Sequence, residues 1–159
     1  MTWEVNLEYT PKSTTIIDRL ITILTTASDA GVVDSTADNA LTYPYMNFLK
    51  DPSQVDGETR FPVCVVTCVS EDFEVADNQR VVGTYNIDIF YTEARRQFRA
   101  DLLRQLAHET RRIIVRNPPP DCKIVHVDNI RYGAGVTTDK LEPVGRAVIR
   151  LQFKYKEQR

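Results

Sequence analysis

The sequence predicts an α+β fold in which two helices lie on one face of a four-stranded, mainly antiparallel sheet. Three observations lead to this prediction: two segments carry apolar residues at helical spacing, four segments have the pattern of strands, either alternating or apolar on both faces, and the segments follow the order α-ββ-α-ββ. An N-terminal extended arm precedes them. The length of 159 residues, with 42% apolar and 26% charged residues, is typical of one globular domain, 1–159, with its own core.

The first elements are the arm and the first helix. Residues 1–12 alternate apolar and polar side chains up to Pro11, which predicts an extended segment. Residues 14–27 then carry Ile and Leu in two adjoining rows at helical spacing, after a run of Ser and Thr that can cap a helix. The apolar stripe is wide, so we expect more than a single sheet to cover this helix.

A long loop is predicted over 28–60, where the periodicity fails. Asp, Asn, Ser, Gly and Pro gather there around Tyr43, Tyr45 and Phe48. A loop of this length is unusual in a compact domain and is commonly functional or ordered by a partner. Two interpretations remain open: the aromatic side chains cap the edge of the core, or they contact a partner.

The next two elements are predicted to be a pair of strands. The run FPVCVVTCV, 61–69, has β-branched residues on both faces, so both faces should be buried. A polar connection, 71–79, leads to an alternating segment, 81–91, which we expect to be its hairpin partner.

The second half of the chain predicts a helix over 93–116 and strands over 123–132 and 144–156. Three prolines at 118–120 end the helix. In the last strand Arg146 and Arg150 are predicted to face outward. The residues predicted to face inward are Ala147, Ile149, Leu151, Phe153 and Tyr155. Between the last two strands, 133–143 predicts a long hairpin loop, which is either a mobile surface loop or a contact to another subunit.

Charge is unevenly distributed along the chain. The net charge of -2 argues against a generally basic nucleic-acid-binding protein. The predicted second helix nevertheless carries seven arginines against three carboxylates, which leaves the C-terminal half basic and the N-terminal half acidic. A molecule of this kind can associate head to tail.

No catalytic, cofactor-binding or metal-binding motif is present. The three cysteines form no CxxC pair, and Cys64 and Cys68 would lie roughly 13 Å apart on one strand, too far for a disulfide. Cys122 and His126 would share a face at the same spacing, so they would not form a catalytic dyad, and His126 is expected to be a partly buried strand residue. We find neither a signal peptide nor a run of about 20 apolar residues. We therefore expect a cytosolic protein without a membrane partner.

In the order of these elements and in their residue patterns, the chain resembles the tail terminator and tail-to-head joining proteins of long-tailed bacteriophages. The resemblance covers 14–157 and lies in the segments IIDRLITIL, FPVCVV, VVGTYNIDIFYT, RRQFRADLLRQLAHETRRIIV and GRAVIRLQFKYK. It implies a small α/β subunit of a six-fold ring at the top of the tail tube, without catalytic residues. The arm from Trp3 to Tyr9 has no counterpart in that family.

The resemblance implies a structural virion protein of the tail neck, assembled in the host cytoplasm. Its implied partners are further copies of the chain, the tail tube protein and the head connector, and the genome DNA would pass through the ring without sequence-specific binding. Three alternatives stay open: another neck or baseplate subunit of the same fold, a host regulatory α+β domain that binds a small ligand, and a thiol hydrolase. The candidate interface residues are Trp3, Tyr43, Tyr45, Phe48, Tyr132, Lys140, Arg146 and Arg150.

Overall fold

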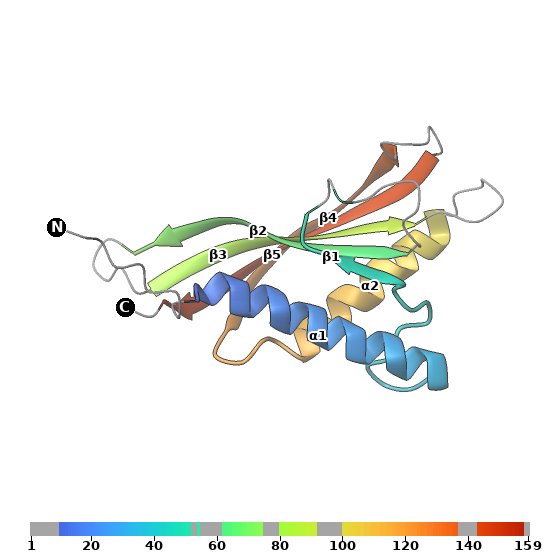
Figure 1. Ribbon diagram of the computed structural model, residues 1–159, viewed down its shortest axis with the longest axis horizontal. Helices are drawn as coiled ribbons and strands as arrows, with labels where there is room; N and C mark the ends of the chain where they lie inside the picture. Colours follow the sequence, from blue (N-terminus) through green and yellow to red (C-terminus); the bar gives the residue numbers. More distant parts are fainter. Residues whose placement is uncertain are drawn as a thin grey trace, which may run out of the picture.

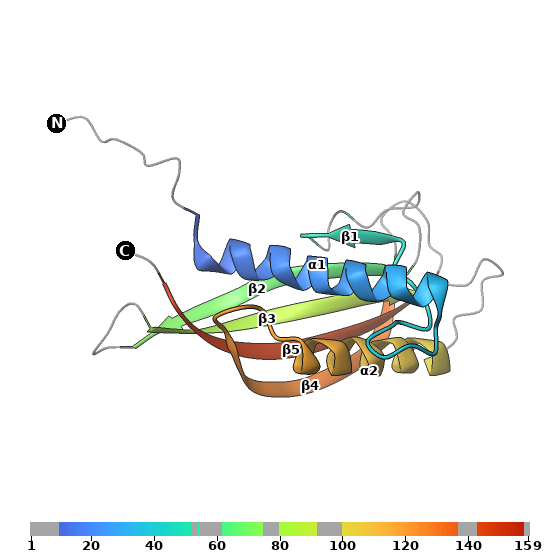
Figure 2. The same cartoon turned by 90° about the horizontal axis from the view of Figure 1, so that it is seen from below.

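Over the residues that the structure describes, the protein has an α+β fold with two helices and a five-stranded mixed sheet of order β1-β2-β3-β5-β4. The computed structural model describes residues 10–51, 54, 62–74, 80–91, 100–136 and 143–157. Both helices cover the same face of the sheet (Figures 1 and 2). The elements are α1 (Lys12–Val33), β1 (Asn47–Leu49), β2 (Val63–Phe73), β3 (Arg80–Tyr91), α2 (Ala100–Arg116), β4 (Lys123–Val136) and β5 (Pro143–Lys156).

The sheet differs from the prediction by one strand. The four predicted strands pair antiparallel, β2 with β3, β3 with β5, and β5 with β4. A fifth strand, β1, pairs parallel with β2 from Asn47 opposite Val63 to Leu49 opposite Val65. With three residues it is too short to produce an alternating pattern, and it lies inside the segment that was predicted to be a loop.

Helix α1 is longer than predicted, because it begins at Lys12 and continues past residue 27 to Val33. The following segment then folds back onto it, and the Leu41 N–H donates to the Ala27 carbonyl at 3.0 Å. Gly31 permits this close approach, since a Cβ atom there would overlap the Leu41 carbonyl oxygen. The predicted loop 28–60 is therefore partly helix and partly core.

Helix α2 confirms the prediction over its described part, 100–116, while 93–99 lie outside the described residues. Leu103, Leu106 and Ile114 are buried on the side that packs on the sheet and on α1. The expectation that α1 needs cover besides the sheet is confirmed, since α2 supplies it.

Strand β5 follows its predicted alternation, and β2 follows its predicted burial on both faces over its first half. The five residues of β5 predicted to face inward are all buried. In β2, Cys64 and Val66 pack into the core beneath the helices, whereas Val63 and Val65 pack on the opposite side with Phe90. Both faces of this strand are therefore buried over its first half, as predicted; towards its far end Val69 is half exposed.

The connection between β4 and β5 is shorter than predicted. Strand β4 extends to Val136 and β5 begins at Pro143, so 133–136 and 143 of the predicted loop 133–143 are strand, while 137–142 lie outside the described residues. Gly133 and Gly135 lie near the end of β4, an edge strand, and Pro143 is the first residue of β5, positions at which a sheet tolerates these residues.

Neither described helix combines the length and the apolarity that a membrane span requires.

Candidate interaction surface

Alternation along the strands gives the sheet a second, largely polar face. On β5 the side chains of Arg146, Val148 and Arg150 point away from the helices, and the strand register brings Asp88 of β3 and Asp128 of β4 to the same side. We call this surface the helix-free face. It holds both arginines of β5 that were predicted to be interface residues.

An ion pair between a buried carboxylate and a half-exposed guanidinium lies at its centre. Asp88 is 4% exposed at its side chain, and its Oδ2 accepts a hydrogen bond from Arg146 Nη2 at 2.6 Å. The Arg146 guanidinium also lies over the Phe90 ring, 5.3 Å from the ring centroid. Arg146 is therefore a structural residue of this face as well as a half-exposed cation.

A second polar group lies beside it on β4 and β5. Asp128 Oδ2 is 3.5 Å from Arg150 Nε, and Asp128 Oδ1 is 3.1 Å from His126 Nε2. His126 is exposed, so the expectation of a partly buried histidine is wrong. The cause is a register shift between Ile124 and His126, which moves His126 to the helix-free face.

Several buried polar atoms of this face have no hydrogen-bond partner. They are Asn86 Oδ1, Asp88 Oδ1, Arg146 Nε and Arg150 Nε, and all four belong to residues whose side chains point away from the helices. Buried polar groups of folded proteins nearly always have a hydrogen-bond partner. All four atoms are shielded from solvent within the subunit, so the polar centre of this face is incompletely hydrogen-bonded.

The end of the helix-free face towards β1 is apolar. Val63, Val65 and Phe90 form a second small core there, against which Leu49 packs. Val63, Val65 and Phe90 are buried, so the accessible part of the helix-free face is its charged centre.

The aromatic residues of the 43–48 segment lie elsewhere, in the core or at its edge. Tyr45 is buried, its hydroxyl is 2.6 Å from Thr110 Oγ1, and its N–H donates to Ser28 Oγ. Phe48 is half-buried and contacts the Tyr45 ring edge-on, and Tyr43 is half-buried. Tyr45 is therefore wrong as an interface residue, and the interpretation that these aromatics cap the core is confirmed for it.

Of the remaining predicted interface residues, Tyr132 is 43% exposed on the helix side of β4, opposite Ala147. Partial burial raises the pKa of its hydroxyl, and the nearby Arg104 opposes that shift. Trp3 and Lys140 lie outside the described residues.

The three cysteines are free, as predicted. Burial, and secondarily the charge of Asp88, raises the pKa of the Cys64 thiol far above its ordinary value. Burial also raises the pKa of Cys68 and of Cys122. Cys122 lies in the core on the helix side while His126 lies on the helix-free face, so the expectation that they share a face is wrong.

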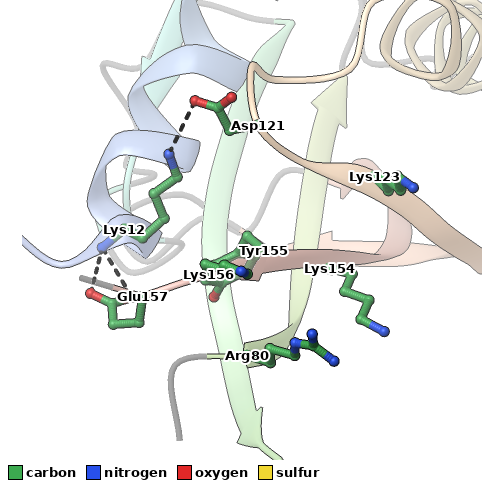
Figure 3. A pocket seen from close by; sticks show the side chains of 8 residues that line it. All are labelled: Lys12, Arg80, Asp121, Lys123, Lys154, Tyr155, Lys156 and Glu157. Carbon is green, nitrogen blue, oxygen red and sulfur yellow. Dashed lines mark hydrogen bonds and ion pairs between the residues drawn. The ribbon is translucent and has the colours of Figure 1, made fainter. Parts of the chain in front are cut away.

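A cavity of about 670 Å³ opens at the end of the sheet, beside the start of α1 (Figure 3). Five cationic and two carboxylate side chains line it, together with one tyrosine. The Lys12 N–H donates to the Glu157 carboxylate at 3.0 Å, and Lys12 Nζ lies 3.9 Å from Asp121 Oδ2. The lining residues are Lys12, Arg80, Asp121, Lys123, Lys154, Tyr155, Lys156 and Glu157.

The basic character of the C-terminal strand is visible in the sequence, but this convergence of cations is not. The cations come from α1, β3, β4 and β5, and only the strand register brings them to one end of the sheet. Within the described residues, no group of three or more histidine, cysteine or acidic side chains could hold a metal ion.

In comparisons with known proteins, neither a family model nor a curated protein matches the chain.

Proposed function

We propose that the chain is a structural subunit of a phage tail neck, a tail terminator that forms a six-membered ring on the tail tube. In this role the ring ends the growth of the tube and presents a docking surface to the head connector, and DNA passes through it without sequence-specific contacts. The protein would act in the virion, after assembly in the host cytoplasm, without catalysis or a cofactor.

The observation that carries this proposal is the incompletely hydrogen-bonded, charged centre of the helix-free face. The buried Asp88 pairs there with the half-exposed Arg146, yet Asp88 Oδ1, Arg146 Nε and Asn86 Oδ1 have no hydrogen-bond partner. The side chains of Arg146 and Arg150 are each 42% exposed there, so groups of a partner can still pair with them on assembly. The resemblance of 14–157 to tail terminators supplies the identity of the assembly.

The test is an assay of tube growth. Wild-type protein mixed with the polymerising tail tube protein of its own phage should arrest growth and appear in electron micrographs as one terminal disc with six-fold averages. Tubes that keep elongating without terminal density, at every concentration of added protein, would contradict the assignment.

A charge reversal on the helix-free face sharpens the assay. Arg150→Glu should weaken the capping of tubes, and more so at low salt, because the lost contact is electrostatic. Arg150 suits this test better than Arg146, whose reversal would set a carboxylate beside the buried Asp88. The matched control is Arg116→Glu at the exposed end of α2, which should cap as the wild type does.

A second candidate function is a small ligand-binding regulatory domain, which the cavity beside α1 favours. Such a domain would bind an anionic small molecule as a monomer, whereas the terminator would assemble. A neck or baseplate subunit of the same fold would also assemble, but would not stop tube growth.

A further inference from the structure

The two ends of the long axis carry opposite charge. Helix α1 runs along this axis, with Lys12 beside the cavity at one end and Val33 at the other (Figures 1 and 2). Its 22 residues separate the two ends by roughly 33 Å. We call Arg80, Lys123, Lys154 and Lys156 the basic end. We call Asp29, Asp34 and Asp38, with the neighbouring Val32 and Val33, the acidic tip.

The basic end contains like charges directly opposite each other. Arg80 faces Lys156 across β3 and β5, and Lys123 faces Lys154 across β4 and β5. Such pairs destabilise a sheet unless an anion compensates them. Glu74 contacts both Arg80 (3.8 Å) and Lys154 (3.7 Å), but Lys123 and Lys156 form no ion pair within the described residues.

The acidic tip lacks any compensating cation along the chain. No lysine or arginine occurs between Arg19 and Lys50, and the last turn of α1 holds no basic residue to offset the negative end of the helix dipole. Asp34 accepts hydrogen bonds from the backbone and hydroxyl of Thr36, which lower the pKa of its carboxyl and keep it ionised.

Both ends also expose apolar side chains. Val32 and Val33 are 72% and 88% exposed at the tip. Phe73, at the far end of β2, is 53% exposed and faces Val81, the neighbour of Arg80. Charge and apolar surface therefore occur together at each end, with charges of opposite sign.

We propose that the acidic tip of one copy docks in the cavity at the basic end of the next copy, so that subunits associate head to tail. The bound carboxylates would compensate the two like-charge pairs, and the valines would cover Phe73. A contact between two different surfaces closes into a ring when its rotation divides a full turn. Closure at six subunits rests on the proposed function, whereas the contact itself does not.

The test is a complementary charge swap. One variant, Lys123→Glu/Lys156→Glu, makes the basic end acidic. The other, Asp29→Lys/Asp38→Lys, makes the tip basic. All four positions are exposed, and lysine near the C-terminus of α1 favours the helix, so both variants should fold, which circular dichroism checks.

Sedimentation velocity at about 0.01 M salt, where charges act over about 30 Å, measures the association. We expect each variant alone to associate at least about tenfold more weakly than wild type, since both of its ends then carry the same sign. The equimolar mixture should recover wild-type association, because every contact again joins opposite charges. A mixture that associates no better than either variant alone would overturn the proposal, as would a wild type that stays monomeric.

Two controls distinguish this contact from a general effect of net charge and from phosphate binding. Arg104→Glu/Arg111→Glu makes the same change of net charge on the exposed face of α2 and should leave association unchanged. The second control is a binding assay with duplex DNA. If DNA binds wild type but not the Lys123→Glu/Lys156→Glu variant, and the equimolar mixture of variants does not recover association, the basic end binds phosphates instead. Recovery of association without capping of tubes would reject the proposed function and leave the contact standing.

Discussion

The two faces of the sheet differ in what their side chains do, although the same strands supply both. On the helix side Tyr85, Ile87 and Phe153 are fully buried in one continuous core. On the helix-free face Asp88 and Arg146 form a charged centre with unpartnered atoms. The difference teaches that stability comes mainly from one face, which leaves the other available for recognition.

The largest expected effect is on the helix side. Leu106→Ala should lower the free energy of unfolding by about 2–5 kcal/mol, because it opens a cavity where the leucine is buried between α2 and the sheet. Denaturant titration measures it. The matched control, Val115→Ala at an exposed position of the same helix, should change stability by no more than about 0.5 kcal/mol. Equal losses of stability in the two variants would contradict the claim that the buried helix side stabilises the fold.

On the helix-free face the largest effect concerns the pair of Asp88 and Arg146. Arg146→Ala should cost about 1–3 kcal/mol, because Asp88 stays buried without its cation. In the double variant with Asp88→Ala the loss should be less than the sum of the two single losses, since the partners interact directly. Additive losses in denaturant titration would mean that the pair contributes nothing to this face.

A pH dependence should come from the helix side. Burial raises the pKa of Cys64 in the folded state, so the thiol stabilises the fold below its unfolded pKa of about 8.5, and this stabilisation is lost as the pH rises further. Above about pH 9 the loss for one group is at most about 1.4 kcal/mol per pH unit. Cys64→Ala should reduce the slope of unfolding free energy against pH by that amount, and an unchanged slope would contradict the burial of this thiol.

The smallest expected effect on stability is at Arg150. Its contact with Asp128 is partly exposed, so Arg150→Gln should change the free energy of unfolding by less than about 1 kcal/mol. The same variant should weaken the capping of tubes. A large loss of stability without a change in capping would mean that Arg150 stabilises the fold and does not contact the tube.

Much of the fold could be predicted from periodicity alone. The alternation of β5 and the apolar rows of α2 correspond to buried residues, because each pattern extends over several turns or residue pairs. The three-residue β1 and the extension of α1 to Val33 could not be predicted, since both depend on contacts with distant residues such as Val63 and Leu41.

The candidate site was less predictable than the fold. Arg146 and Arg150 could be predicted because they alternate with buried residues, but the partner of Arg146, Asp88, lies on another strand and only the register brings the two together. The prediction for Tyr45 was wrong because an aromatic residue in an aperiodic segment gives no sign of its buried partners, Ser28 and Thr110. The basic end depends in the same way on the pairing of β3, β4 and β5.

The most direct test of the central claim is hydroxyl-radical footprinting of the free subunit and of the subunit bound to tail tubes. Oxidation of His126 and Val148 on the helix-free face should fall on assembly, whereas oxidation of Val115 on the exposed side of α2 should not change. Protection of Val115 with unchanged oxidation of His126 and Val148 would contradict the claim.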